Sequence, residues 1–109
     1  MTIAAGEVAL VPTGLVMAIP PGHFLGVFAR SSTPIKKGLM VANGVGVVDP
    51  DYCGERDEIK IEVYNFTSKP VHVQRGDRLA QGVIIPFARA AWHEDVPSAT
   101  SRGGFGSTG

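Results

Sequence analysis

The sequence predicts an all-β fold, a sandwich or barrel of the jelly-roll type. Its glycines and prolines, 14 and 8 in number, divide the chain roughly every eight to twelve residues into short runs of strand-forming side chains. Apolar and polar residues alternate along Ile59–Tyr64, as expected for a strand with one buried face. No window combines a sustained helical period with capping residues. Many short strands separated by turns are typical of sandwiches and barrels.

The strand-forming runs follow one another along most of the chain. The predicted strands are Glu7–Val11, Leu15–Ile19, Phe24–Ala29, Leu39–Val41, Val45–Asp49, Ile59–Asn65, Val71–Gln74 and Leu79–Pro86. The nearest helical candidate is Phe87–Trp92, about one or two turns long. We expect one β domain over residues 1–96. Small residues dominate after that point, so residues 97–109 are expected to form a flexible, glycine-rich C-terminal arm.

Composition limits the possible functions. The chain has 109 residues, a formal net charge of zero and a mean hydropathy of +0.14. Without a basic excess we expect no nucleic-acid or membrane partner, and no apolar run reaches the ~18 residues of a membrane span. A small apolar domain can complete its core by oligomerising. Cys53 is the single cysteine and no signal peptide is visible, so we expect a cytoplasmic location.

The segment Asn43–Tyr52 is the richest candidate for chemistry, and we expect it to form a hairpin. Its glycines indicate a bend, or a place where another group approaches the backbone closely. Asp49 and Asp51 follow, and each admits two roles. A carboxylate can orient and deprotonate a water molecule, or it can cap a turn before Tyr52. On its own, the turn is the stronger interpretation.

Two further segments carry groups suited to phosphate. Arg30 offers a planar fork of donors, and Ser31 and Ser32 add hydroxyl groups, although a polar surface turn is the simpler interpretation of these three residues alone. Gln81 lies in an apolar strand, where its amide needs a hydrogen-bond partner.

The arm combines a glycine-rich backbone with a cation, an aromatic ring and hydroxyl groups. Backbone N–H groups of such a loop can line a phosphate while an Arg neutralises it and a Phe stacks on a base. As an isolated motif this is weak, but the closing lid of a nucleotide site would need these parts. The residues are Arg102, Phe105, Ser107 and Thr108.

Taken together and in order, four segments resemble the second to fifth signature motifs of the trimeric dUTP pyrophosphatase (dUTPase) family. They are ARSS (Ala29–Ser32), NGVGVVDPDYCG (Asn43–Gly54), RGDRLAQ (Arg75–Gln81) and RGGFGSTG (Arg102–Gly109). The resemblance covers nearly the whole chain. It implies a jelly-roll homotrimer that hydrolyses dUTP to dUMP and pyrophosphate. Such an activity keeps uracil out of DNA and supplies dUMP for dTMP synthesis.

The resemblance also implies a role for each motif, in active sites that lie between subunits. Tyr52 would pack under the deoxyribose and exclude a ribose 2′-hydroxyl. Asp49 would contact the 3′-hydroxyl and activate the water that attacks the α-phosphorus in line. Uracil would be held through backbone groups of the hairpin, whose binding residues are Asn43, Gly46, Val47 and Val48.

The remaining motifs would surround the triphosphate. Mg²⁺ is the implied cofactor, held by the triphosphate and waters with no direct protein ligand. Phe105 would stack on uracil, with Gly106 also at the substrate, while Arg102 and Ser107 hold the outer phosphate. Neighbouring subunits would grip phosphates through Arg30, Ser31, Ser32 and Gln81.

The chain departs from the family pattern at three places. The first motif, Ala-Gly-x-Asp-Leu, whose aspartate helps to hold hydrated Mg²⁺, is not in the sequence, which starts at Met1, and we expect truncation rather than a lost metal site. Glu55–Glu58 lengthens the link after the hairpin, and Arg102 lies closer to Phe105 than is common. Two alternatives stay open: a catalytically impaired trimer that binds nucleotide, and, less favoured, an enzyme related to dCTP deaminase. A deaminase would need a glutamate beside the hairpin, and no clear one is present.

Overall fold

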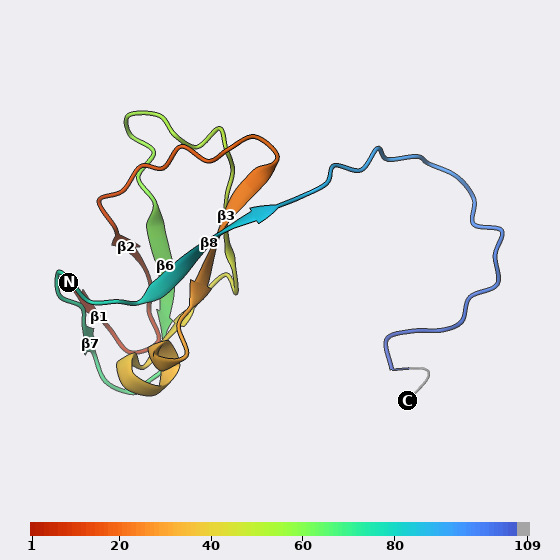
Figure 1. The fold of residues 1–109 in the computed structure, drawn as a ribbon. Helices are drawn as coiled ribbons and strands as arrows, with labels where there is room; N and C mark the ends of the chain where they lie inside the picture. Colours follow the sequence, from red (N-terminus) through yellow and green to blue (C-terminus); the bar gives the residue numbers. More distant parts are fainter. Residues whose placement is uncertain (107–109) are drawn as a thin grey trace.

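The computed structural model of the chain describes residues 1–106, and strands dominate it (Figure 1). The predicted all-β fold is confirmed. One short helical element, η1, spans Thr33–Lys37. The strands are β1 (Thr2–Ile3), β2 (Val8–Pro12), β3 (His23–Ala29), β4 (Leu39–Val41), β5 (Gly46–Val48), β6 (Lys60–Asn65), β7 (Val71–His72) and β8 (Ala80–Pro86).

The strands form three small antiparallel sheets, in the orders β1-β7, β2-β6-β4 and β5-β3-β8. In the third sheet, β3 and β8 pair along their whole length, from His23 opposite Pro86 to Ala29 opposite Ala80. β5 pairs with the middle of β3, from Val48 opposite Leu25 to Gly46 opposite Val27. This register sends the residues after β5 toward one end of the sheet and the residues after β3 toward the other.

Two clusters of buried side chains lie between the sheets. Ile61 on β6 packs against both clusters and so joins them. Burying an aliphatic side chain of this kind contributes roughly 1.5–3 kcal/mol, which makes the clusters the main link between the sheets. The first contains Ile3, Val11, Leu39, Val63, Val73 and Leu79, and the second Ile19, Leu25, Val27 and Ile59.

The fully buried Asn65 organises the chain between β6 and β7. Its Nδ2 donates to the carbonyl oxygens of Ile3 (3.0 Å) and Lys69 (2.8 Å), and its Oδ1 accepts from the backbone N–H and the hydroxyl of Thr67 (2.9 and 2.7 Å). Because buried polar groups must be hydrogen-bonded, these bonds allow an amide to occupy the core. They also tie the N-terminal strand to the rest of the body.

The predicted strand Leu15–Ile19 was wrong. This segment belongs to no sheet, although the backbone N–H of Ile59 donates to Leu15 O at 2.8 Å. Pro20 and Pro21 follow it directly, and proline has no N–H to donate to a strand ladder. The apolar pattern that suggested a strand reflects anchoring in the core, because the segment's last residue, Ile19, is buried.

The helical candidate Phe87–Trp92 does not form a helix. The chain leaves the body after β8 and continues as an irregular linker, residues 88–96, into the arm (Figure 1). A helix this short is unstable without tertiary packing, and Trp92 is 98% exposed. The radius of gyration of 18.5 Å reflects this extension, because a compact domain of similar length has about 13 Å.

Candidate active site

The turn after β5 lies at the centre of the candidate site. The chain turns through Asp49, Pro50 and Asp51, and the backbone N–H of Tyr52 closes the turn by donating to Asp49 O at 3.1 Å. A cavity of about 450 Å³ lies on one side and a cavity of about 550 Å³ on the other, and Asp49 and Asp51 line both. The turn interpretation and the active-site interpretation of Asp49 are therefore compatible.

The smaller cavity, which we call the Tyr52 cavity, collects several of the residues predicted to hold a nucleoside. Val47, Val48 and Asp49 line it beside Tyr52, whose side chain is 40% exposed and whose hydroxyl donates to Glu58 O at 2.8 Å. Sequence reasoning gave no role here to the lining residues that lie outside the recognised motifs, Leu10, Glu58, Ile59 and Lys60. Asp51 does lie in a motif, but it had been weighed only as a carboxylate or turn cap.

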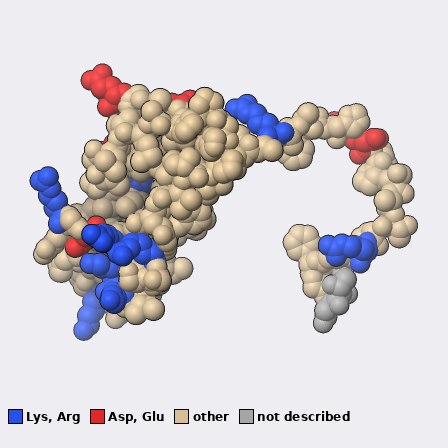
Figure 2. Space-filling model, viewed as in Figure 1, with Lys and Arg blue, Asp and Glu red and all other residues tan. Residues whose placement is uncertain are grey.

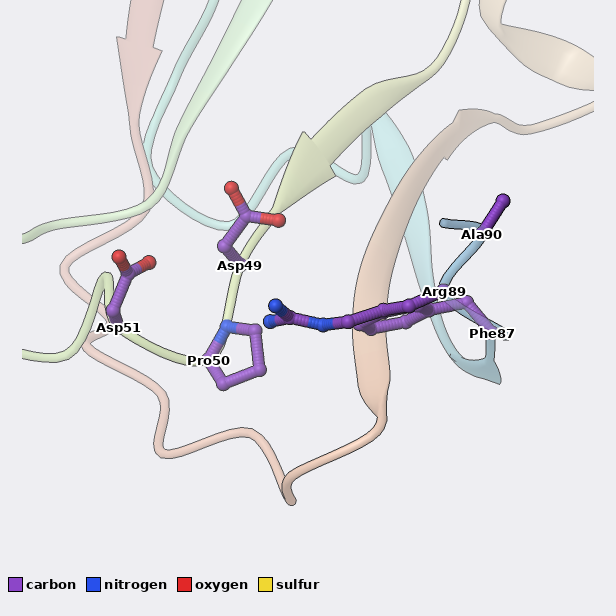
Figure 3. Close-up of a pocket in the computed structure, with 6 residues that line it drawn as sticks. All are labelled: Asp49, Pro50, Asp51, Phe87, Arg89 and Ala90. Atoms are coloured by element: carbon purple, nitrogen blue, oxygen red, sulfur yellow. The ribbon is translucent and has the colours of Figure 1, made fainter. Parts of the chain in front are cut away.

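The larger cavity lies between the turn and the start of the linker. Figure 3 shows Arg89 extending from the linker toward Pro50 and the two carboxylates. Phe87 fixes the start of the linker, because its N–H donates to Gly22 O at 3.0 Å and its ring lies 6.2 Å from that of Phe24. Arg89 carries no motif signal, so sequence reasoning passed over it. The lining residues are Asp49, Pro50, Asp51, Phe87, Arg89 and Ala90.

The predicted hairpin was wrong, because β4 and β5 belong to different sheets and do not pair with each other. The chain turns a corner between them, and Gly44 supplies the left-handed conformation there (φ 74°). At Gly46 an added Cβ would lie 3.0 Å from the Cβ of Val27, so packing against β3 already requires a glycine. β5 is the edge strand of its sheet, and one side of its backbone faces no neighbouring described strand.

The predicted phosphate-binding residues gather at the opposite end of β3. The hydroxyl of the buried Thr33 accepts from the backbone N–H of Arg30 (2.9 Å) and donates to Leu79 O (2.8 Å), which fixes the turn. The Arg30 guanidinium donates to Arg78 O at 3.4 Å. Gln81 Nε2 donates at 3.0 Å to the carbonyl oxygen of Ala29, the residue directly before Arg30. Gln81 thus has the partner that its apolar strand requires. The exposed Ser31 and the half-buried Ser32 complete the turn.

A helical turn and several cations surround this end of the body. Sequence reasoning missed η1, although Pro34 in its first turn and Gly38 just after its end are typical helix boundaries. Lys37 pairs with Asp77 at 3.6 Å. The pKa of Asp77 lies below its ordinary value of 3.8, chiefly because the N–H of Gln74 donates to its carboxylate and also because Lys37 is near. Figure 2 shows Lys and Arg side chains gathered around this end.

The two groups of predicted residues do not meet within one chain. Val48 lies opposite Leu25, and Arg30 follows β3 five residues later, a separation of roughly 17 Å at the rise of an antiparallel strand. Asp49 and Arg30 of the same chain therefore lie at opposite ends of the sheet.

The arm residues also lie apart from both groups. Figure 1 shows the arm curving away from the body, and the side chains of Arg102 and Phe105 are exposed, as is Gly106. Phe105 has a positive φ of 48°. Ser107 lies outside the described residues.

Two general features of the described chain bear on function. Among residues 1–106, no three His, Cys, Asp or Glu side chains come close enough together to hold a metal ion. A search of the same residues finds no helix that is long and apolar enough to cross a bilayer.

The all-β body, with a carboxylate turn at one end, cations and an amide at the other and a glycine-rich arm, has the features of a nucleotide-processing enzyme subunit. Comparison with known proteins then gives the family. The dUTPase family model matches residues 1–109, and this chain belongs to the dUTPase family.

Individual relatives agree with this assignment. The chain is 41% identical to the deoxyuridine 5′-triphosphate nucleotidohydrolase of Lactococcus lactis, over 100% of its own length and 75% of that protein. It is 46% identical to the protein of the same name from an Anaeromyxobacter species, of which it covers 74%. Among solved structures, the dUTPase from Streptococcus mutans superposes with a TM-score of 0.79 at 39% identity, over 84% of this chain and 74% of the other.

Proposed function

We propose that this chain hydrolyses dUTP to dUMP and pyrophosphate. The observation that carries the proposal is the position of Asp49, on a turn between two cavities, one of which also contains the Tyr52 ring and residues of the edge strand β5. The same activity appears in the names of the bacterial relatives. A cytoplasmic location stays a prediction from the sequence, as does the lack of nucleic-acid and membrane partners.

The nucleoside half of dUTP binds along β5. The free backbone edge of Gly46–Val48 offers N–H and C=O groups in a fixed order, which suits uracil and disfavours cytosine, whose donors and acceptors are exchanged. Asn43 lies beside the base. Tyr52 packs under the sugar and leaves no room for a 2′-hydroxyl.

Asp49 acts as the general base of the reaction. It accepts a proton from a water molecule, whose oxygen forms a bond to the α-phosphorus as the bond to the bridging oxygen of pyrophosphate breaks. The leaving pyrophosphate carries away the electron pair of that broken bond. Positioning and charge neutralisation supply most of the acceleration.

A complete site needs residues from more than one copy. The phosphate-binding set is Arg30, Ser31, Ser32 and Gln81, and its separation from Asp49 in one chain supports its supply by a neighbouring copy. The arm then closes over the nucleotide, with Phe105 on the base, Gly106 also at the substrate, and Arg102 and Ser107 at the outer phosphate. A homotrimer with three shared sites satisfies these conditions.

The residues present suit a Mg²⁺ ion that is carried by the nucleotide. Mg²⁺ keeps several waters and binds phosphate oxygens, so it needs no cluster of three protein ligands, and residues 1–106 offer none. When bound, the ion neutralises charge that develops on the phosphates. The chain's own contribution is to hold the triphosphate and to take the proton from water.

A comparison of four nucleotides tests this function. The purified chain is incubated with Mg²⁺ and dUTP, dCTP, dTTP or UTP, and pyrophosphate and ammonia are measured. We expect pyrophosphate from dUTP alone. Ammonia from dCTP would indicate a deaminase, and tight binding of dUTP without turnover would indicate a nucleotide-binding trimer.

A further inference from the structure

The loop between Tyr52 and β6 is closed by two hydrogen bonds between Gly54 and Asp57. The backbone N–H of Gly54 donates to Asp57 Oδ2 at 2.9 Å, and the N–H of Asp57 donates back to Gly54 O at 3.0 Å. A Cβ at Gly54 would lie 2.9 Å from Asp57 Oδ2, so the loop closes too tightly there for a side chain. These reciprocal bonds fix the geometry that leads into Glu58.

Glu58 connects this loop to Tyr52. Its carbonyl oxygen accepts from the Tyr52 hydroxyl at 2.8 Å. A tyrosine ring tethered at its outer end cannot swing about its χ1 and χ2 bonds, whereas an untethered, partly exposed ring can change rotamer. The tether therefore holds the ring in one place on the wall of the Tyr52 cavity.

The side chain of Glu58 is in turn anchored on the segment before β3. Its Oε1 accepts from the N–H of Gly14 at 2.8 Å, and Gly14 has the left-handed φ of 73° that glycine adopts readily. The neighbouring Ile59 is buried, and its carbonyl accepts from the Thr13 hydroxyl at 2.6 Å. The carbonyl that holds Tyr52 is thus attached to a buried part of the body.

We infer that Glu58 is a positioning residue, which holds the Tyr52 ring against the sugar and so sharpens discrimination between deoxyribose and ribose. The inference rests on the proposed function, which assigns the sugar to Tyr52. To reject a 2′-hydroxyl, the Tyr52 ring must stay in one rotamer, because a mobile ring would move aside for the extra oxygen atom. Glu58 also lines the Tyr52 cavity, but its role in positioning the ring runs through its bonds to Gly14 and Tyr52.

Binding of dUMP and UMP by the full chain tests this inference without relying on turnover. Isothermal titration gives the ratio of the two Kd values for the wild type, Glu58→Ala, Glu58→Gln and Tyr52→Phe. We expect Glu58→Ala and Tyr52→Phe to lower the preference for dUMP by about two- to tenfold, the worth of one hydrogen bond. Glu58→Gln should keep the wild-type preference, because its amide oxygen still accepts from Gly14 although the charge is gone.

A double variant adds a second check. Tyr52→Phe removes the tether, and Glu58→Ala removes the anchor that fixes the tether's carbonyl on Gly14. Because both act on the same tether, together they should lower the preference no further than Tyr52→Phe alone. An unchanged preference in Glu58→Ala, or an equal loss in Glu58→Gln, would overturn the inference. If the wild type prefers dUMP but does not hydrolyse dUTP, the proposed function fails while the Kd ratios still decide the role of Glu58.

Discussion

Asp49 is the residue on which the proposed chemistry depends most. It shares the turn after β5 with Asp51, and both carboxylates line both cavities, so geometry alone does not separate them. The proposed function assigns proton transfer to Asp49, since this residue directly follows β5, the strand proposed to hold uracil.

Substitution of the two carboxylates separates their roles. Asp49→Asn keeps the size of the side chain but cannot accept the proton, so we expect kcat to fall by about 10²- to 10⁴-fold. Affinity for a non-hydrolysable dUTP analogue should stay close to that of the wild type. Asp51→Asn is the matched variant, with a far smaller effect on kcat. If Asp51→Asn were the more damaging of the two, the assignment of the base would be reversed.

At the scale of single residues, the sequence indicated which residues carry functional groups, but not the packing contact that makes a particular glycine necessary. Arg30 and Gln81 lie at the same end of β3, and Asp49 and Tyr52 line the same cavity. The glycines of this segment indicated a bend or the close approach of another group, and at Gly46 the approaching group is Val27 of the same chain. A contact between residues so distant in sequence is invisible until the strands are paired.

At the scale of elements, η1 and the glycine that ends it hold the phosphate end of the body together. Gly38 has a left-handed φ of 69°, and an added Cβ would lie 2.7 Å from the Thr67 Cγ2. Two separate penalties therefore oppose a side chain here: backbone strain and a steric clash with the β6–β7 turn.

Alanine substitutions at Gly38 and Gly22 separate the steric clash with Thr67 from the backbone strain of a left-handed φ. We expect Gly38→Ala to lower the free energy of unfolding by about 2–4 kcal/mol, from strain plus overpacking. Gly22→Ala is the control, because Gly22 has a similar φ of 76° with no atom within 4 Å of an added Cβ, and it should cost only about 1–2 kcal/mol. Urea unfolding gives both values. Equal losses of unfolding free energy in the two variants would show that the β6–β7 turn moves to accommodate the added methyl group, so that no clash remains.

Element predictions failed where tertiary contacts override local pattern. Leu15–Ile19 has the apolar spacing of a strand but is anchored by core packing and isolated hydrogen bonds. The corner between β4 and β5 looked like a hairpin because two β-branched runs flank its glycines. Which partner each strand takes depends on the whole fold, and the local sequence does not encode that choice.

At the scale of the whole molecule, the linker and arm carry large apolar side chains that no other part of a single copy covers. Trp92, Val96 and Phe105 are each at least 84% exposed, and Figure 1 shows this part of the chain extending from the body. Sequence composition predicted the arm, but not that the chain leaves the body immediately after β8. That point depends on where packing against β3 ends.

Removing the arm tests its role without disturbing the body. Deletion of Arg102–Gly109 should reduce dUTP turnover by at least about tenfold, because the lid that excludes water from the phosphates is lost. The unfolding midpoint should stay unchanged, since the buried clusters lie entirely within β1–β8 and the segments between them. Wild-type turnover in the shortened chain would contradict the lid role.

The shared site is the central claim, and a mixing experiment tests it most directly. Asp49→Asn and Arg30→Ala chains, each inactive alone, are unfolded together at equal amounts, refolded, and assayed for pyrophosphate release from dUTP. Sites that take Asp49 from one copy and Arg30 from another should be restored to about a quarter of the wild-type rate by random assembly. Mixing Asp49→Asn with an Asp49→Asn/Arg30→Ala double variant is the control and should restore nothing. No recovery in the first mixture, although mixed trimers form, would contradict a site built from two copies.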